Sequence, residues 1–84
     1  MEVAFSRAQL EVDAIRHLAS LLMETEDYEE AWVQIERLRE LAEATADPEG
    51  RVSRRMYAMA FAFNFQVRRG DVEKAAGEIE VTPF

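Results

Sequence analysis

The sequence predicts an all-α protein built from antiparallel helical hairpins, with three long helices and a short fourth. Three observations support this class. Apolar residues recur every three or four positions along most of the chain, which is the spacing of amphipathic helices. The 84 residues include only three Gly and two Pro, so few positions interrupt a helix. No segment shows the alternation of apolar and polar residues that is typical of a strand.

Length and composition indicate a single folded domain, residues 1–84. Hydrophobic residues make up 49% of the chain and charged residues 32%, a balance that is typical of folded proteins and not of disordered tails. There is no cysteine, so neither a disulfide nor a thiolate metal site can stabilise the fold. A chain of this size often completes its core by self-association or by docking on a partner.

The first two helices are predicted to form one hairpin over residues 6–46. Ser6 and Gln9 have the spacing of a capping box, and they open a first helix over residues 6–24. Its apolar positions are Ala8, Val12, Ile15, Leu18, Ala19 and Leu22. Asp27 can cap a second helix, whose apolar face carries Tyr28, Ala31, Trp32, Ile35, Leu38, Leu41 and Ala42. Because only residues 25–27 connect the two helices, we expect them to run antiparallel.

A second, truncated hairpin is predicted over residues 51–80. Residues 46–50 (ADPEG) are the clearest break in the chain. Asp47 can cap a third helix and Pro48 suits a first helical position, and the helix is predicted over residues 51–69. Gly70 is a natural C′ residue. Asp71 can cap the short fourth helix, which continues through Ile79.

One pattern occurs twice, at residues 27–31 (DYEEA) and 71–75 (DVEKA). Each copy follows an apolar helix and opens a second one. This arrangement resembles the tetratricopeptide repeat, and residues 12–45 match its length of about 34 positions. The chain departs from the family at Glu26, where the repeat favours Gly, and at Phe63, where it favours a small residue. The resemblance implies stacked helix pairs that bind protein. Because such units usually need about three copies to be stable, it also points to association.

Charge and hydropathy exclude two classes of partner. The net charge of −7 argues against nucleic acid, whose phosphates require a basic surface. The longest apolar run, residues 56–63, is about eight residues, against the roughly 20 that a membrane-spanning helix needs. No secretory signal precedes the first helix, so a cytoplasmic location is the expectation.

The residue types needed for catalysis or for a cofactor are not found together. His17 is the only histidine and there is no cysteine, so a Cys–His pair cannot form. The acidic residues around positions 24–30 lack calcium-loop spacing. No glycine-rich loop could cradle a phosphate. We therefore expect a protein that is not an enzyme and that holds no cofactor or metal.

Charged residues suggest an electrostatic contact. The only basic cluster, Arg51, Arg54 and Arg55, lies at the start of the predicted third helix, where the helix dipole disfavours it. This favours contact with acids elsewhere, such as Glu26, Glu29 and Glu30, or with another chain. Simple solvation of the three arginines is the alternative.

The predicted third helix carries two apolar stripes about 160° apart at 100° per residue. One contains Val52, Met56, Met59, Phe63 and Val67, and it includes the positions that a repeat helix turns toward its hairpin mate. The other contains Tyr57, Phe61 and Phe65, and it either covers the first hairpin or remains for another molecule. Trp32, one turn after Tyr28, is either core or an interface aromatic.

These observations predict a helical protein-binding module that forms a homodimer through its third helix. The predicted interface residues are Tyr57, Phe61, Phe65 and Trp32. The alternative is a regulatory subunit or antitoxin-like protein that docks its aromatic stripe on one larger partner.

Overall fold

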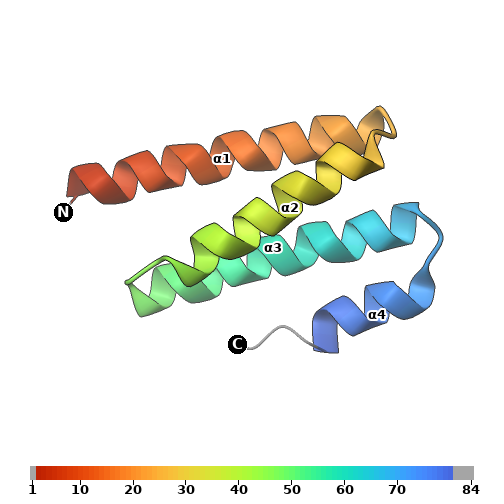
Figure 1. Ribbon diagram of the computed structural model, residues 1–84. Coiled ribbons are helices and arrows are strands. Elements are labelled where there is room, and N and C mark those ends of the chain that lie inside the picture. Colours follow the sequence, from red (N-terminus) through yellow and green to blue (C-terminus); the bar gives the residue numbers. More distant parts are fainter. Residues whose placement is uncertain (1, 81–84) are drawn as a thin grey trace.

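Four helices make up the described part of the chain. The computed structural model describes the backbone of residues 2–80 and the side chains of residues 7–80. The helices are α1 (Glu2–Glu24), α2 (Tyr28–Glu43), α3 (Pro48–Arg68) and α4 (Val72–Glu80), and residues 2–80 contain no strand (Figure 1). The all-α class, with three long helices and a short fourth, is confirmed.

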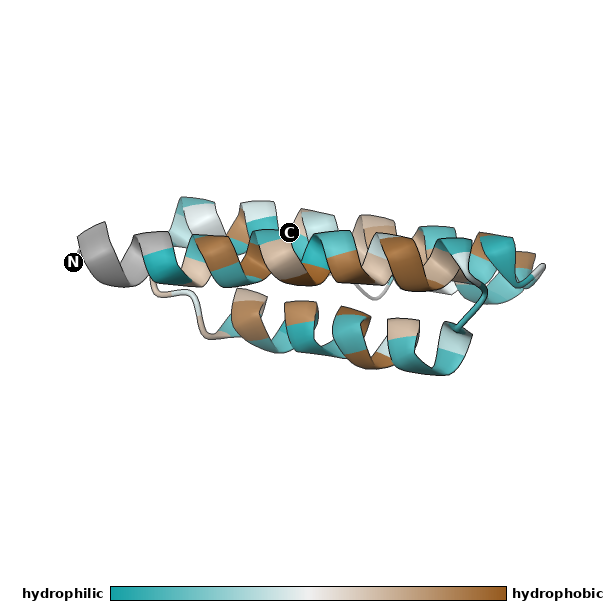
Figure 2. Cartoon of the chain, turned by 90° about the horizontal axis from the view of Figure 1, so that it is seen from above, coloured by the Kyte–Doolittle hydropathy of each residue, from teal (hydrophilic) through white to brown (hydrophobic). Residues whose placement is uncertain are grey.

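The helices pack chiefly against their neighbours in sequence. α1 lies on α2, α2 on α3 and α3 on α4, whereas α1 and α3 touch at few points. The Cα atoms span 41 × 27 × 13 Å, so the molecule is thin in one direction. In Figure 2, apolar and polar bands alternate along the helices, as expected of amphipathic helices with one buried face.

α1 starts earlier than the sequence predicts. The helix begins at Glu2, so Ser6 lies inside it and is not the N-cap residue. Residues 2–5 contain neither Gly nor Pro, and an acidic residue at position 2 suits the positive end of the helix dipole. The Ser–Gln spacing therefore permits a helix start at Ser6 without requiring one.

The turn between α1 and α2 has the hydrogen bonds of a Schellman motif. The Glu26 N–H donates to the Met23 carbonyl at 3.1 Å, and the Asp27 N–H donates to the Leu22 carbonyl at 2.8 Å. Glu26 has φ +62°, the left-handed conformation that usually selects glycine at this position. Asp27 occupies the N-cap position of α2, but its side chain makes no capping hydrogen bond.

The turn between α3 and α4 repeats this geometry with glycine in place. The Gly70 N–H donates to the Val67 carbonyl at 2.9 Å, and the Asp71 N–H donates to the Gln66 carbonyl at 2.9 Å. Gly70 has φ +78°. The Asp71 carboxylate accepts from the Lys74 N–H at 3.0 Å, which confirms the predicted cap of α4.

α3 begins one turn earlier than predicted, at Pro48. The Asp47 carboxylate accepts from the Gly50 N–H at 2.7 Å, which confirms Asp47 as the cap and Pro48 as a first-turn residue. Gly50 is therefore helical. The Asp47 carboxylate satisfies the Gly50 N–H, a donor of the first turn that has no partner within the helix. The helix can therefore begin at Pro48 and not only at Arg51.

Two hydrophobic clusters fill the space between α1, α2 and α3. One is formed by Met23, Ala31, Ile35, Ala62 and Phe65, with Leu22, Tyr28, Trp32 and Phe61 packed around it. The other is formed by Val12, Ile15, Leu38 and Ala58, with Leu41 and Phe61 packed around it. Ala19 and Ala31 have no exposed surface, as expected of small residues that let helix backbones approach closely. Phe61 joins the two clusters.

Candidate interaction surfaces

Of the two alternatives for the aromatic stripe of α3, the structure favours packing against the first hairpin for Phe61 and Phe65. Phe65 is 3% exposed and Phe61 contacts both clusters, whereas Tyr57 of the same stripe is 37% exposed. The other stripe lies largely on the surface. Small Ala58 and Ala62, both buried, lie beside Phe61 and Phe65 on the helix. They allow α3 to approach its neighbours closely enough for the aromatic rings to fill the core.

Two of the predicted interface aromatics, Phe65 and Trp32, contact each other within the chain. The Phe65 ring meets the Tyr28 ring edge to face, with centroids 5.7 Å apart, and lies 4.9 Å from the Trp32 ring. Tyr57, at the edge of this face, carries the Arg16 guanidinium 3.9 Å from its ring centroid. Because Phe65 is enclosed by these rings, it cannot reach a partner unless the core opens. Phe65 is therefore a core residue, whereas Tyr57 is 37% exposed and Trp32 and Phe61 are partly buried, so a contact of these three with another molecule stays a prediction.

The surface of α3 is instead marked by four large apolar side chains, which we call the α3 outer stripe: Val52, Met56, Phe63 and Val67. They are between 38% and 52% exposed. Exposed Ala60 and half-buried Met59 lie among them. Their spacing of four, seven and four residues places all four on one side of the helix.

A second apolar surface, the α1 outer stripe, consists of Leu10, Leu18 and Leu21. These residues are between 42% and 69% exposed. Leu18 was expected in the core, but it lies outside because the buried positions are Val12, Ile15, Ala19 and Met23. A helix that is apolar at both position 18 and position 19 can bury either one, and small Ala19 allows the closer approach to α2.

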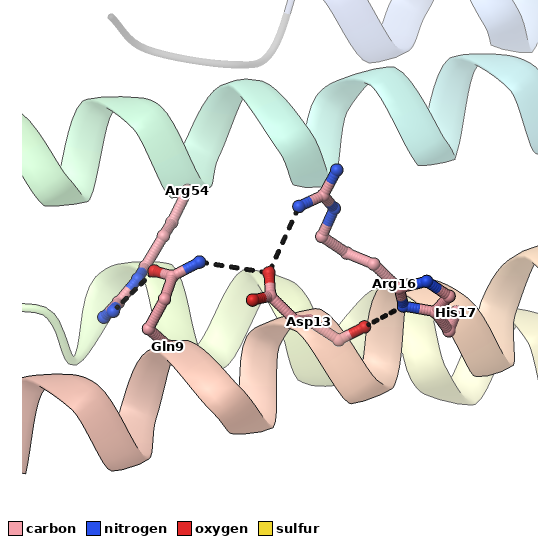
Figure 3. A network of polar contacts seen from close by, with 5 residues as sticks. All are labelled: Gln9, Asp13, Arg16, His17 and Arg54. Atoms are coloured by element: carbon pink, nitrogen blue, oxygen red, sulfur yellow. Dashed lines mark hydrogen bonds and ion pairs between the residues drawn. The ribbon is translucent and has the colours of Figure 1, made fainter.

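A polar network links α1 and α3 (Figure 3), and Arg54 extends it to the α2–α3 connection. Arg54 is only 5% exposed and donates to Thr45 Oγ1 at 2.7 Å and to Gln9 Oε1 at 3.2 Å. Gln9 Nε2 donates to Asp13 Oδ1 at 3.1 Å, and Arg16 Nη1 contacts the same oxygen at 3.3 Å. Arg54 therefore has a structural role, because its guanidinium connects the first and third helices.

The other two arginines of the basic cluster also bind groups near the α2–α3 connection. Arg51 Nε donates to the Thr45 carbonyl at 3.1 Å. Arg55 donates two hydrogen bonds to the Glu43 carboxylate, at 2.6 and 2.7 Å. The hydrogen bond from Arg55 holds the pKa of Glu43 below its usual value of 4.5.

The predicted acidic partners lie elsewhere. Glu26, Glu29 and Glu30 are exposed around the α1–α2 turn, at the other end of α2 from the arginines. Contact between the two groups within one chain is therefore not formed. Contact between them in two chains stays a prediction.

Sequence reasoning missed a pocket of about 440 Å³ between α2, α3 and α4. Its lining residues are Tyr28, Glu29, Trp32, Phe65, Gln66, Arg69 and Lys74. Arg39 of α2 forms an ion pair with Glu78 of α4, so α4 is held toward α2. The only sequence feature that could have indicated the pocket is Gln66, a polar residue among apolar ones. Residue spacing does not show that three helices meet around this residue.

Neither a metal-binding cluster nor a membrane-spanning helix is found among the described residues. Residues 7–80 contain no group of three or more His, Asp or Glu side chains arranged to hold a metal ion. His17 Nδ1 lies 2.8 Å from the Asp13 carbonyl of its own helix. No helix in the described part of the chain has the length and apolar character needed to cross a membrane. No protein-family model, curated protein or solved structure matches this chain.

Proposed function

We propose that this chain is a small helical protein-interaction module, not an enzyme, and that it forms a homodimer through the α3 outer stripe. One observation carries the proposal: four large apolar side chains on a single face of α3 are between 38% and 52% exposed. Contiguous apolar patches on soluble proteins commonly mark interaction surfaces.

The order of residues in the stripe suits pairing with itself. In an antiparallel pair of α3 helices, Val52 of one copy faces Val67 of the other, and Met56 faces Phe63. Exposed Ala60 then lies near the two-fold axis, where a small side chain permits close approach. Such a contact is isologous, so it closes as a dimer and does not extend into a fibre.

The size of the stripe predicts a weak dimer. At these exposures, the four side chains present roughly 300 Å² of surface per copy. Pairing removes roughly 600 Å² from water, a gain of roughly 15 kcal/mol at about 25 cal/mol per Å². Association itself costs about 4–15 kcal/mol. Since a stable interface buries at least about 1,200 Å², we expect a dimer in the micromolar range or weaker.

Sedimentation velocity from about 5 μM to about 1 mM tests this range. The wild-type chain is expected to pass from monomer to dimer, and the double variant Met56→Glu, Phe63→Glu is expected to stay monomeric with unchanged helix content. Leu18→Glu, Leu21→Glu is the matched control on α1 and should dimerise like the wild type. A wild-type monomer at every concentration, or equal loss in the control, would overturn the proposal.

We further infer that the helices form two antiparallel hairpins of tetratricopeptide-like design. The two Schellman turns support this inference, because each reverses the chain between an apolar helix and its successor with the same pair of hydrogen bonds. α2 has 16 residues and α4 has 9, so the second hairpin is shortened and the chain holds about one and a half repeat units. An incomplete array leaves the face of a helix without the next unit, which is consistent with an exposed stripe on α3.

Docking on a larger partner is the second candidate. The α1 outer stripe favours it, because a two-fold contact through α3 leaves Leu10, Leu18 and Leu21 in water. A partner that covers both stripes would have to contact α1 and α3 together. The two double variants above separate the candidates: capture of one specific protein that is lost in both variants supports docking, whereas a concentration-dependent dimer lost only in the α3 variant supports self-association.

A further inference from the structure

We propose that the pocket between α2, α3 and α4 binds a small planar aromatic carboxylate. The pocket lies on the core side of α3, so this inference is independent of the α3 outer stripe and of self-association. Its volume of about 440 Å³ falls within the range of about 300–1,000 Å³ that is typical of small-molecule sites. It suits a ligand of one or two fused rings.

Aromatic rings form the apolar part of the pocket. Tyr28, Trp32 and Phe65 all line it, and Tyr28 and Trp32 are only partly buried. Phe65 holds the other two rings in place through contacts at 5.7 and 4.9 Å between ring centroids. A planar ring system can therefore stack on or meet the edges of rings that are already ordered, with little loss of side-chain freedom on binding.

The side-chain amide of Gln66 offers a polar contact in the pocket wall. Gln66 is 7% exposed and lines the pocket, yet among the described residues its side chain has no hydrogen-bond partner. The Gln66 amide atoms are not fully buried, because Arg16 Nε is the buried side-chain atom without a partner among the described residues. The amide can therefore bind a group that enters the pocket it lines. An oxygen of a bound ligand would accept from the Gln66 NH₂ group.

The charge at the rim selects an anion. Arg69 and Lys74 line the pocket together with a single acid, Glu29, although the whole chain has a net charge of −7. The Arg69 guanidinium lies 5.7 Å from the centroid of the Phe65 ring, and no described residue forms an ion pair or hydrogen bond with its side chain. Lys74 has only a 3.9 Å contact with Asp71. The planar fork of Arg69 suits the two oxygens of a carboxylate.

Nuclear magnetic resonance titration with 2-naphthoate tests the proposal directly. Trp32 is the only tryptophan, so its indole N–H signal is unambiguous and reports from the pocket wall. We expect saturable shifts of that signal and of the Gln66 and Arg69 amides, with a Kd of about 1 mM or tighter for a ligand of this size. The neutral analogue 2-naphthamide should bind about three- to tenfold more weakly.

Two neighbouring arginines provide a matched pair of variants. Arg69→Gln should weaken 2-naphthoate about three- to tenfold and leave 2-naphthamide unchanged. Arg68→Gln is the control, because the Arg68 side chain donates to Asn64 at 3.2 Å and does not line the pocket. Repeating the titration in the monomeric Met56→Glu, Phe63→Glu background keeps the result separate from self-association.

Three outcomes would overturn the proposal. The first is the absence of saturable shifts at Trp32 with 2-naphthoate. The second is equal affinity for the acid and the amide, because the site would then be an apolar pocket without anion recognition. The third is an equal loss of 2-naphthoate affinity in Arg68→Gln and Arg69→Gln. The preference for the acid over the amide would then come from the overall charge of the protein and not from Arg69. Gln66→Leu adds a further check, since it preserves apolar packing and should weaken both ligands.

Discussion

Replacing Glu26 with glycine is expected to stabilise the fold. Glu26 is exposed and has φ +62°, and its carboxylate forms no ion pair or hydrogen bond with another described side chain. A left-handed conformation costs a non-glycine residue about 1–2 kcal/mol. Glycine removes that cost but adds about 0.5–1 kcal/mol of backbone entropy to the unfolded chain. The expected net gain in the free energy of unfolding is about 0.5–1 kcal/mol.

Thermal unfolding followed by circular dichroism can resolve this gain. For a domain of this size, 1 kcal/mol corresponds to a Tm shift of about 4–8 °C. All variants must be compared at one protein concentration, because self-association would raise the apparent Tm.

Three companion variants separate backbone conformation from charge and packing. Glu26→Ala removes the same carboxylate but keeps the strained φ, so its Tm should stay close to that of the wild type. Gly70→Ala should lower stability by about 1 kcal/mol; an added Cβ would meet nothing within 4 Å there, so φ +78° is the only cost. Gly77→Ala lies inside α4, also in open space, and should raise stability by about 0.5–1 kcal/mol.

The explanation by backbone conformation would be refuted in either of two ways. Glu26→Gly could leave the Tm unchanged or lower it. Alternatively, Glu26→Ala could stabilise the fold as much as Glu26→Gly, which would assign the effect to the charge near the helix termini.

Three further predictions concern the core, the buried network and pH. Phe65→Ala should destabilise the fold by about 3–5 kcal/mol, measured by urea unfolding, whereas Phe63→Ala should cost less than about 1 kcal/mol in the monomer because Phe63 is on the surface. Thr45→Val removes the Oγ1 acceptor of Arg54 and should cost about 1–3 kcal/mol in the same assay; an unchanged midpoint would contradict a structural role for this bond. Because the folded pKa of Glu43 is depressed, the stabilisation from its pair with Arg55 is present above pH 4.5 and is lost as pH falls through the folded pKa. Glu43→Gln should therefore flatten the acid side of the stability–pH curve, and an identical curve would show that the pair is screened by solvent.

The helices and their turns could be predicted because their signals are local. Asp47 with Pro48, and Gly70 with Asp71, fix helix ends through hydrogen bonds to residues no more than five positions away. Glu26 adopts the conformation that glycine adopts in the second turn. The repeated turn was therefore visible in the sequence even where its usual residue was replaced.

Periodicity alone could not predict which face of α3 is buried. Helical spacing separates Phe65 and Phe63 by angle, but it does not state which of two apolar stripes meets the core. The decision depends on tertiary neighbours: Ala58 and Ala62 permit close approach on one side, and Tyr28 and Trp32 from α2 enclose Phe65 there. The pocket was missed for the same reason, because Gln66, Arg69 and Lys74 meet the residues of α2 only when three helices pack together.

The thinness of the molecule links the two apolar faces of α3 to its proposed assembly. A fold whose Cα atoms span 13 Å in its shortest direction is too thin to enclose a helix on all sides, since packed helix axes are about 8–10 Å apart. Among the described residues, α2 and α4 pack closely on α3 and α1 touches it at few points, whereas the α3 outer stripe stays exposed. In a protein that stays monomeric, polar residues would be expected on this exposed face of α3. Val52, Met56, Phe63 and Val67 lie there instead, and an apolar patch of this kind is what the proposed self-association would cover.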